Sequence, residues 1–340
     1  MSWEPSTDFW RHRKVVVTGG TGFIGRHVVE QLTSSGWHVV ALHRPSADVR
    51  HLETYGAELV PGSVTDAKSI GRGMPPACDA VFHIAGNTSL WSGDDAEQTD
   101  VNVTGTAIVV EAAITKEARF FVHTSTVGAW GHQPVIPFDE TASSNANDSA
   151  INYERTKYWG ELEVEKGISR GLKGVIMNPG HVLGRYDVTG WARLIRGVHQ
   201  KKLPGVPPGA GCWASADEVA RAHIAAVERG RVGDRYLLGG VEATYLDVVR
   251  IIGTLTGRRV PRRPIPAWAL RAFGQVSQWG SYVTRRAPQV TPEIAEATAR
   301  PPHYFKSDRA IRDLGYAAVP LADMLRESYD WLKAENLLDS

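Results

Sequence analysis

The pattern of apolar segments predicts an α/β protein built on a doubly wound parallel sheet, with a smaller C-terminal lobe. Short runs rich in β-branched residues alternate with stretches of helical spacing through the first half of the 340-residue chain. This alternation is typical of successive βαβ units. After Pro179-Gly180, loops rich in glycine and proline become frequent, and tryptophans appear among them. Such loops indicate a second lobe rather than further βαβ units.

The individual elements follow in chain order. The first predicted strand, Lys14–Thr18, ends in glycines and leads directly into a helical stretch at residues 24–32. We expect a first domain over residues 12–178 and a lobe over residues 179–340, some segments of which return to the first domain. The other strands are predicted at residues 37–42, 80–84, 119–125, 174–178 and 235–238, and the other helices at residues 104–113, 217–228, 245–255 and 321–338.

Charge and cysteine usage restrict the partners of the chain. With 38 basic and 37 acidic residues and a formal net charge of +1, it lacks the long-range positive field that gathers nucleic acid. Cys78 and Cys212 are far apart, and the histidines form no His-Glu-x-x-His pair. We therefore expect neither a nucleic-acid partner nor a metal site.

The chain is also expected to be cytoplasmic, without insertion into a membrane. Residues 1–14 are polar and charged, and no run of about 18 apolar residues follows. Residues 258–263 are strongly basic; we interpret them as a solvated linker, with contact at a membrane surface as the alternative. The amphipathic stretch at residues 268–282 either caps a pocket or closes the lobe.

A glycine loop joins the first predicted strand to the first predicted helix. Gly19, Gly22 and Gly25 stand three residues apart, so backbone N–H groups and the helix N-terminus can approach a pyrophosphate closely. The same glycines without a strand and a helix around them would be weak support. In this frame they predict a Rossmann-type dinucleotide site.

The end of the second predicted strand favours NADP(H) over NAD(H). An acidic residue usually binds the ribose hydroxyls of NAD at this position, but here His43-Arg44 follows Leu42. A guanidinium can bind a 2′-phosphate through charge-assisted hydrogen bonds. The alternative is that Arg44 lies on a solvated surface and that NAD(H) binds instead.

Tyr153 and Lys157 stand four residues apart, so on a helix they share one face. A nearby ammonium stabilises a phenolate and lowers the pKa of a tyrosine, which makes it a usable proton donor or acceptor. The predicted strand at residues 119–125 ends in Thr124-Ser125-Thr126. One of these hydroxyls is expected to hydrogen-bond the substrate oxygen.

Thr18 to Gly25, TGGTGFIG, together with Tyr-x-x-x-Lys, resembles the extended short-chain dehydrogenase/reductases of the NAD-dependent epimerase/dehydratase superfamily. More narrowly, residues 83–86, 153–157, 178–180 and 234–240 are similar to dihydroflavonol 4-reductases and 3β-hydroxysteroid dehydrogenases. The resemblance implies an NADP(H)-binding first domain, a substrate-binding lobe and an NADPH-dependent carbonyl reductase. It also implies that the chain forms a homodimer through the helix that carries Tyr153.

The resemblance assigns roles to individual residues. Tyr153 protonates the substrate oxygen during hydride transfer, and Thr126, with Ser125 as runner-up, orients that oxygen. Asn102 resembles a structural asparagine that positions a helix, and Ser63 departs from the family, which usually has Asp there. The implied catalytic residues are Thr126, Tyr153 and Lys157, and the implied cofactor-binding residues are Gly19, Thr21, Gly22, Phe23, Ile24, Arg44, Ser63, Val64, Ala85, Lys157, Pro179, His181 and Val182.

The substrate is expected to be a small apolar or aromatic ketone or aldehyde. Many sugar-nucleotide enzymes have a phosphate-binding arginine where this chain has Gly211, although an arginine from another loop could replace it. Tryptophans in predicted loops either form a flat apolar pocket or pack in the core. The alternatives are a nucleotide-sugar epimerase or dehydratase, a 3β-hydroxysteroid-type dehydrogenase and a non-catalytic NADP(H) sensor. The replacement arginines would be Arg185, Arg193 or Arg196, and the tryptophans are Trp91, Trp130, Trp191 and Trp213.

Overall fold

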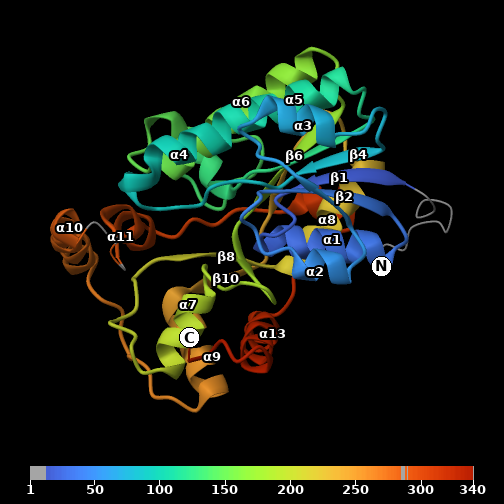
Figure 1. Cartoon of the computed structure of the whole chain (residues 1–340). Helices are drawn as coiled ribbons and strands as arrows, with labels where there is room; N and C mark the ends of the chain where they lie inside the picture. Colours follow the sequence, from blue (N-terminus) through green and yellow to red (C-terminus); the bar gives the residue numbers. More distant parts are fainter. Residues whose placement is uncertain (1–12, 285–287, 289, 340) are drawn as a thin grey trace.

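A seven-stranded parallel sheet forms the centre of the molecule (Figure 1). The computed structural model describes residues 13–284, 288 and 290–339. The strand order is β3-β2-β1-β4-β5-β6-β9. The chain adds strands on one side of β1 as far as β3 and then continues on the other side with β4, so the switch point lies between β1 and β4. Ligands of such sheets bind at this point, beyond the carboxyl ends of the strands. The strands are β1 (Lys14–Thr18), β2 (His38–His43), β3 (Glu58–Pro61), β4 (Ala80–His83), β5 (Phe121–Thr124), β6 (Gly174–Pro179) and β9 (Arg235–Leu238).

Helices cover both faces of this sheet, which explains why its strands are almost continuously apolar. Because side chains alternate along a strand, Val15 and Val17 enter the core on one face while Val16 enters the core on the other. The first face is covered by α1 (Phe23–Ser34), α2 (Arg50–Thr54), α8 (Ala216–Arg229) and α12 (Asp308–Leu314), and the second by α3 (Ala67–Gly73), α5 (Gly105–Thr115) and α6 (Asn152–Ser169) (Figure 1).

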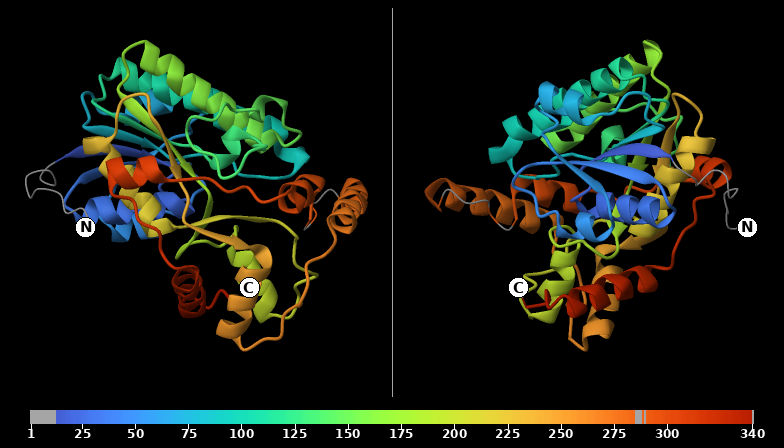
Figure 2. Two further views of the ribbon diagram at one scale, coloured as in Figure 1. Left: turned by 180° about the vertical axis from the view of Figure 1, so that it is seen from behind. Right: turned by 45° about the vertical axis from the view of Figure 1, so that its right-hand side comes forward.

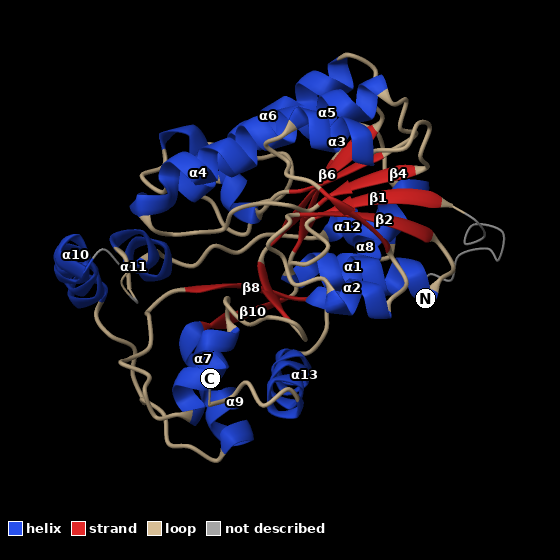
Figure 3. Cartoon of the chain, in the orientation of Figure 1, coloured by secondary structure: helices blue, strands red, loops and turns tan. Residues whose placement is uncertain are grey.

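The smaller lobe contains a three-stranded sheet of order β10-β8-β7 with helices packed beside it (Figure 3). α9 begins in a capping box in which the Thr244 hydroxyl accepts from Asp247 N and the Asp247 carboxylate accepts from Thr244 N, so its boundary is encoded locally. The elements of the lobe are β7 (His181–Leu183), β8 (Ala210–Ser215), β10 (Val241–Thr244), α7 (Ala192–His199), α9 (Tyr245–Thr256) and α13 (Leu321–Ala334).

Two further helices lie together at one side of the molecule. α10 (Ala267–Thr284) is the outer one, and α11 (Pro292–Ala299) lies against it (Figures 1 and 2). The remaining short elements are η1 (Ser92–Asp94), α4 (Asp95–Thr99), the π-helical turn η2 (Asp100–Thr104), η3 (Val127–Trp130) and η4 (Ala146–Asp148).

The predicted α/β fold with a parallel sheet and a smaller lobe is confirmed. The strands predicted at residues 14–18 and 235–238 have the predicted bounds. The predicted helix at residues 104–113 is preceded by η2, and the final helix ends at Ala334 rather than at residue 338. β9 pairs with β6, with Asn178 opposite Leu237, so a segment beyond residue 179 does return to the large sheet. The domain boundary itself stays a prediction.

Candidate functional site

The glycine loop lies between β1 and α1, at the switch point of the sheet. Gly19 has φ +75°, and a Cβ atom there would lie 2.5 Å from the Ala85 nitrogen. Only glycine combines that backbone conformation with so close an approach. Gly22 precedes α1 and donates its N–H to the Gly19 carbonyl at 3.0 Å. No side chain of the described residues caps the start of α1, so its first amides can face an anion.

The next strand of the sheet is tied to this loop by a buried histidine. His83 Nδ1 lies 2.8 Å from Thr18 Oγ1, and His83 Nε2 lies 3.0 Å from Thr106 Oγ1. Burial lowers the pKa of His83 to about 3, so the ring is neutral at physiological pH. Ala85 N lies 3.4 Å from the same Thr18 hydroxyl. The bonds of His83 therefore hold Ala85 next to the glycine loop.

The ends of β2 and β3 lie side by side next to the glycine loop. His43 is opposite Pro61 in the register, and Gly62 N donates to the His43 carbonyl at 2.8 Å. The Arg44 side chain is exposed at this edge. Ser63 N donates to Ser69 Oγ at 3.1 Å, so its backbone is held by α3. The predicted residues Arg44 and Ser63 thus come to one edge of the sheet.

α6 brings Tyr153 and Lys157 to the end of β5. Lys157 Nζ donates to the Thr124 carbonyl at 2.7 Å within the core. The Thr126 side chain lies near enough to the Tyr153 phenol to lower the pKa of that phenol. The three residues that were predicted to share a reaction centre therefore converge, although they come from two elements.

Ser125 lies on a different side of the chain from Thr126. Its side chain is buried beside the Glu161 carboxylate, where it opposes the rise in the pKa of Glu161 that burial causes. Of the two hydroxyls, that of Thr126 is the one that acts on the pKa of the Tyr153 phenol, which favours Thr126 over Ser125 as the hydroxyl that meets a substrate oxygen.

The acidities of this pair differ from the sequence expectation. Burial raises the pKa of Tyr153, and the Thr126 side chain opposes this only in part. Burial also lowers the pKa of Lys157 to about 8, against the opposing effect of the Glu161 carboxylate. The prediction that Lys157 lowers the pKa of Tyr153 is therefore wrong for this structure, because desolvation dominates and the ammonium is directed to the Thr124 carbonyl.

A buried polar network supports the Thr126 backbone. Asn178 Nδ2 donates to the Thr126 carbonyl at 3.0 Å and to Glu161 Oε1 at 2.5 Å. Glu161 is 1% exposed and pairs with Arg235 Nε at 3.1 Å. Neither Glu161 nor Arg235 is among the site residues predicted from the sequence. The signal for Glu161 was present, since it follows Lys157 by four residues on the same helix face.

Asn102 lies in the π-helical turn η2 and joins α6 to the loop after β4. Its Oδ1 accepts from Asn87 N at 2.8 Å, and its Nδ2 donates to Thr156 Oγ1 at 3.1 Å. These bonds agree with the expectation that Asn102 positions a helix. The turn itself gave no sequence signal, since a π-helical turn inserts into an otherwise ordinary helical pattern.

The segment after β6 packs against the aromatic residues of the lobe. The His181 ring centroid lies 4.7 Å from that of Trp191 and 4.9 Å from that of Trp213. The Tyr245 hydroxyl lies 3.3 Å from His181 Nε2. A Cβ atom at Gly211 would lie 2.6 Å from that same nitrogen. The imidazole therefore occupies the space in which a side chain at position 211 would begin.

Of the two alternatives for the tryptophans predicted in loops, packing in the core is the one that holds for two of the four. Trp130 closes η3 and is 1% exposed, and Trp213 lies in β8 and is fully buried. Each indole donates its N–H to a backbone carbonyl, to Ala142 at 3.0 Å and to Ala243 at 3.1 Å. Both are core residues, because their apolar area outweighs a single N–H that the backbone can satisfy.

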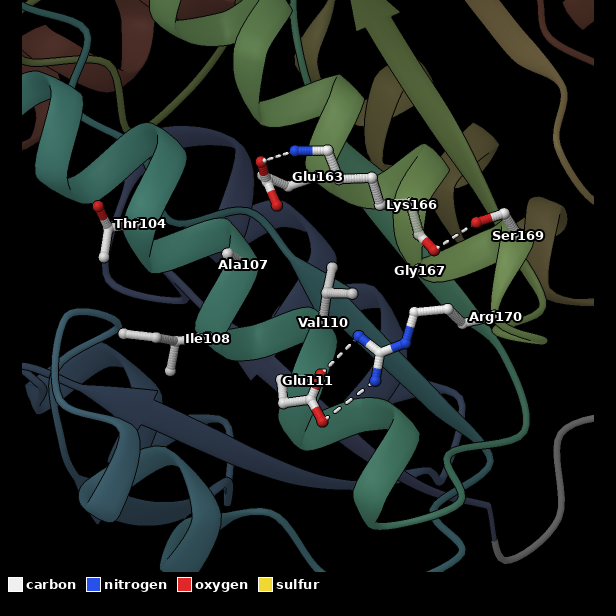
Figure 4. A pocket seen from close by; sticks show the side chains of 10 residues that line it. All are labelled: Thr104, Ala107, Ile108, Val110, Glu111, Glu163, Lys166, Gly167, Ser169 and Arg170. Carbon is white, nitrogen blue, oxygen red and sulfur yellow. Dashed lines mark hydrogen bonds and ion pairs between the residues drawn. The ribbon is translucent and has the colours of Figure 1, made fainter.

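A separate hollow of about 600 Å³ lies between α5 and α6 on the outer side of the molecule (Figure 4). Ion pairs cross it or line it, with Arg170 bound to Glu111 at 2.8 Å and Lys166 bound to Glu163 at 2.6 Å. None of the residues assigned to catalysis or cofactor binding lines this hollow. It is therefore separate from the candidate site.

Residues 15–239 match the model of the NAD dependent epimerase/dehydratase family. The chain belongs to this family. A Synechocystis sp. protein provisionally named dihydroflavonol 4-reductase is 28% identical over 324 residues, 93% of this chain and 94% of the relative. Sterol demethylase protein B of Methylococcus capsulatus is 28% identical over 328 residues, 95% of this chain and 99% of the relative. The crystal structure of the protein designated gox2253 is 28% identical, with a TM-score of 0.83 over 95% of this chain and 98% of that one.

The membership of the epimerase/dehydratase family confirms the predicted family and the prediction of an NAD(P)-dependent enzyme. Such an enzyme takes a nucleotide cofactor and a small-molecule substrate. The glycine loop fits the dinucleotide, because Gly19 admits close approach and the start of α1 is free of a side-chain cap. Within the described residues there is no group of three or more His, Cys, Asp or Glu side chains that could hold a metal ion. No helix in the same part of the chain is long and apolar enough to cross a bilayer.

Proposed function

We propose that this family member is an NADPH-dependent reductase of an apolar or aromatic ketone or aldehyde. The observation that carries the proposal is the packing of His181 over Gly211, since a side chain at position 211 would meet the imidazole. A phosphate-binding arginine therefore has no place there. A substrate without a pyrophosphate suits this arrangement better than a nucleotide sugar.

Two of the three arginines that could replace it are already bound elsewhere. Arg185 pairs with Glu327 at 2.9 Å and with Asp217 at 3.2 Å. Arg196 donates to the Val188 carbonyl at 2.6 Å. Recruiting either to a substrate phosphate would first break these bonds. Arg193 is exposed on α7, and it is the residue on which the alternative, a nucleotide-sugar epimerase or dehydratase, would depend.

In the proposed mechanism, the residues that bind the cofactor and the substrate act without a rearrangement of the backbone. The N-terminus of α1 binds the pyrophosphate, Arg44 binds the 2′-phosphate, and Lys157 binds the ribose hydroxyls through the donors that Thr124 leaves free. Bound NADPH supplies a hydride to the carbonyl carbon. Tyr153 donates its proton to the carbonyl oxygen while Thr126 holds that oxygen by a hydrogen bond.

The raised pKa of Tyr153 suits reduction. A phenol that stays protonated at neutral pH is ready to donate a proton to the developing alkoxide. The two relatives are named for a dihydroflavonol and a sterol, both largely apolar ring systems, which supports an apolar substrate here. We further propose a cytoplasmic location, a homodimer, and the division into an NADP(H)-binding domain and a substrate lobe near residue 178. The remaining residues proposed to line the cofactor are Thr21, Phe23, Ile24, Ser63, Val64, Ala85, Pro179, His181 and Val182.

Titration of the purified chain with NADPH and NADH tests the cofactor assignment. We expect NADPH to bind at least about tenfold more tightly, because a guanidinium on a phosphate forms charge-assisted hydrogen bonds. Arg44→Gln should remove that preference and leave NADH binding unchanged. Arg50→Gln is the matched control, because Arg50 is also exposed a few residues further along the chain but is bound to Asp48. NADH binding as tightly as NADPH would contradict the assignment.

A screen that follows NADPH absorbance tests the substrate class. Apolar and aromatic ketones and aldehydes are expected to be reduced, while UDP-sugars are expected to be left unchanged in a parallel assay with NAD added. Turnover of a nucleotide sugar without turnover of any carbonyl in the panel would replace the reductase by the epimerase or dehydratase alternative. NADPH binding with no turnover in either assay would favour the sensor alternative.

A further inference from the structure

α10 turns an apolar face to solvent. Trp268 is 74% exposed, Trp279 is 71%, Val276 is 63% and Phe273 is 51%. At 100° per residue, positions 268, 276 and 279 fall within about 80° of one helix face, and Phe273 extends the same side. A monomeric protein rarely leaves two tryptophans exposed on one such stripe unless a partner covers it.

The opposite side of α10 packs against α11, so the apolar face of α10 points away from α11 and toward solvent. Leu270 packs with Ala295 and Ala299 of α11 in a small core. Arg271 binds Glu296 of the same helix at 2.8 Å. α10 therefore cannot turn its tryptophans inward without losing its contact with α11. Figures 1 and 2 show both helices at the periphery, with α10 outermost.

The sequence that precedes and includes α10 is rich in arginine, and two of these arginines, Arg250 and Arg271, pair with Asp247 and Glu296 on either side of the stretch. No aspartate or glutamate occurs between Asp247 and Glu293, although the whole chain has 38 basic and 37 acidic residues. Acidic and basic residues are thus balanced over the whole chain, whereas residues 248–292 contain basic residues but no acidic ones. Four of the arginines, at positions 258, 259, 262 and 263, are exposed just before α10. The arginines of this stretch are Arg250, Arg258, Arg259, Arg262, Arg263, Arg271, Arg285 and Arg286.

We infer that α10 docks this protein on an anionic lipid surface. An exposed aromatic face suits a helix that lies in the plane of a membrane interface, and the exposed arginines that precede α10 in the chain would favour an anionic surface. A second copy of the chain would bring the exposed arginines of both copies together, which charge repulsion opposes. A nucleic acid would satisfy the arginines but leave the apolar face uncovered. The docking is peripheral, since none of the described helices can span a bilayer.

Vesicle flotation with the full-length protein tests this inference. The probes are vesicles of phosphatidylcholine alone and vesicles that contain about one quarter phosphatidylglycerol. The protein is expected to float with the anionic vesicles, to stay in solution with the neutral ones, and to be released at about 0.5 M salt, where charges are screened beyond a few ångströms. Tryptophan fluorescence should shift to the blue on binding.

Two double variants separate the apolar and the basic contributions. Arg262→Gln with Arg263→Gln should weaken binding about thirtyfold, since each arginine near an anionic surface contributes about a fivefold change. Trp268→Ser with Trp279→Ser should abolish the fluorescence shift and lower binding at least as much. The matched controls are Arg119→Gln with Arg170→Gln, which are exposed arginines elsewhere, and Val135→Ser, which is 72% exposed.

The outcomes distinguish the occupants of the face. Loss of binding in both α10 variants, with unchanged unfolding transitions and unchanged controls, supports the inference. Failure of the natural chain to float with anionic vesicles overturns it, as does equal flotation of the tryptophan variant. A concentration-dependent dimer that disappears in the tryptophan variant, without vesicle binding, would assign the face to a second copy instead. These measurements use no substrate, so they are independent of the proposed reductase activity.

Discussion

At the scale of single residues, the first ten residues of α6 carry both the candidate proton donor and the side chains that support its surroundings. Tyr153 contacts the Thr126 side chain, while Lys157 is bound to the Thr124 carbonyl and Glu161 to Asn178. Tyr153 can therefore present its proton next to the Thr126 side chain. Lys157 and Glu161, one and two turns further along the helix, support the backbone at Thr124 and Thr126, and Lys157 keeps donors for the proposed contact with the ribose.

Tyr153→Phe is expected to lower kcat at least about a hundredfold, because general acid catalysis contributes about 10² to 10⁴ in rate. NADPH binding, measured by fluorescence titration, should change little, since the lost hydroxyl faces Thr126. Tyr158→Phe, on the same helix, is the control and should retain activity. Substantial residual turnover of Tyr153→Phe would remove this residue from the proton-donating role.

Gly211→Ala is expected to lower the free energy of unfolding by about 1–3 kcal/mol, the usual cost of forcing an extra methyl into packed surroundings. The new Cβ would lie 2.6 Å from His181 Nε2. Gly71→Ala is the control, because nothing lies within 4 Å of a Cβ there and Gly71 is inside α3. That change should stabilise the protein by up to about 1 kcal/mol. Equal urea midpoints for the two variants would show that position 211 tolerates a side chain.

At the scale of elements, one buried ion pair joins α6 to β9, and Asn178 of β6 completes the junction. Burial raises the pKa of Glu161, and the guanidinium of Arg235 opposes this. Glu161 therefore depends on Arg235 to remain ionised in the core. Through Asn178 the same carboxylate reaches the Thr126 backbone, so the packing of the elements and the geometry of the site are coupled.

Arg235→Met is expected to lower the free energy of unfolding by about 3–5 kcal/mol, because it leaves a buried carboxylate without its cation. Arg170→Met removes an exposed ion pair with Glu111, whose side chains are 55% and 56% exposed, and should cost less than about 1 kcal/mol. Chemical denaturation of the two variants measures the contrast. If the two variants lost the same free energy of unfolding, the Glu161 to Arg235 pair would contribute no more to stability than an exposed ion pair.

At the scale of the whole molecule, buried neutral histidines link stability to pH. Burial lowers the pKa of His83 to about 3 and the pKa values of His181, His223 and His303 to about 4. In an unfolded chain these groups titrate near the ordinary value of 6.5. Between these values the unfolded state binds more protons, so stability is fully present above about pH 6.5 and is lost as the pH falls.

Each of these histidines is expected to cost about 2 kcal/mol of stability between neutral pH and about pH 5. Urea denaturation at the two pH values measures the sum. His223→Gln should reduce the difference by about one such contribution. His38→Gln, at a position where the side chain is 53% exposed, should leave it unchanged. A free energy of unfolding that stays constant between the two pH values would show that the rings are not held neutral.

The sequence by itself determined whatever depends on neighbours along the chain. β1 follows from β-branched residues that alternate between two cores, and α9 follows from a capping box. The glycine loop and the Tyr153 to Lys157 spacing were readable for the same reason. Periods of two and of about 3.6 residues are set by local backbone geometry, so no distant contact is needed to read them.

Tertiary structure alone decided the burial and pairing of residues that are distant in sequence. It placed Arg235 beside Glu161, His181 over Gly211, and Trp130 and Trp213 in the core. It also raised the pKa of Tyr153, where the spacing to Lys157 had predicted the opposite. Desolvation and ion pairing depend on which distant segments meet, and local periodicity does not specify that.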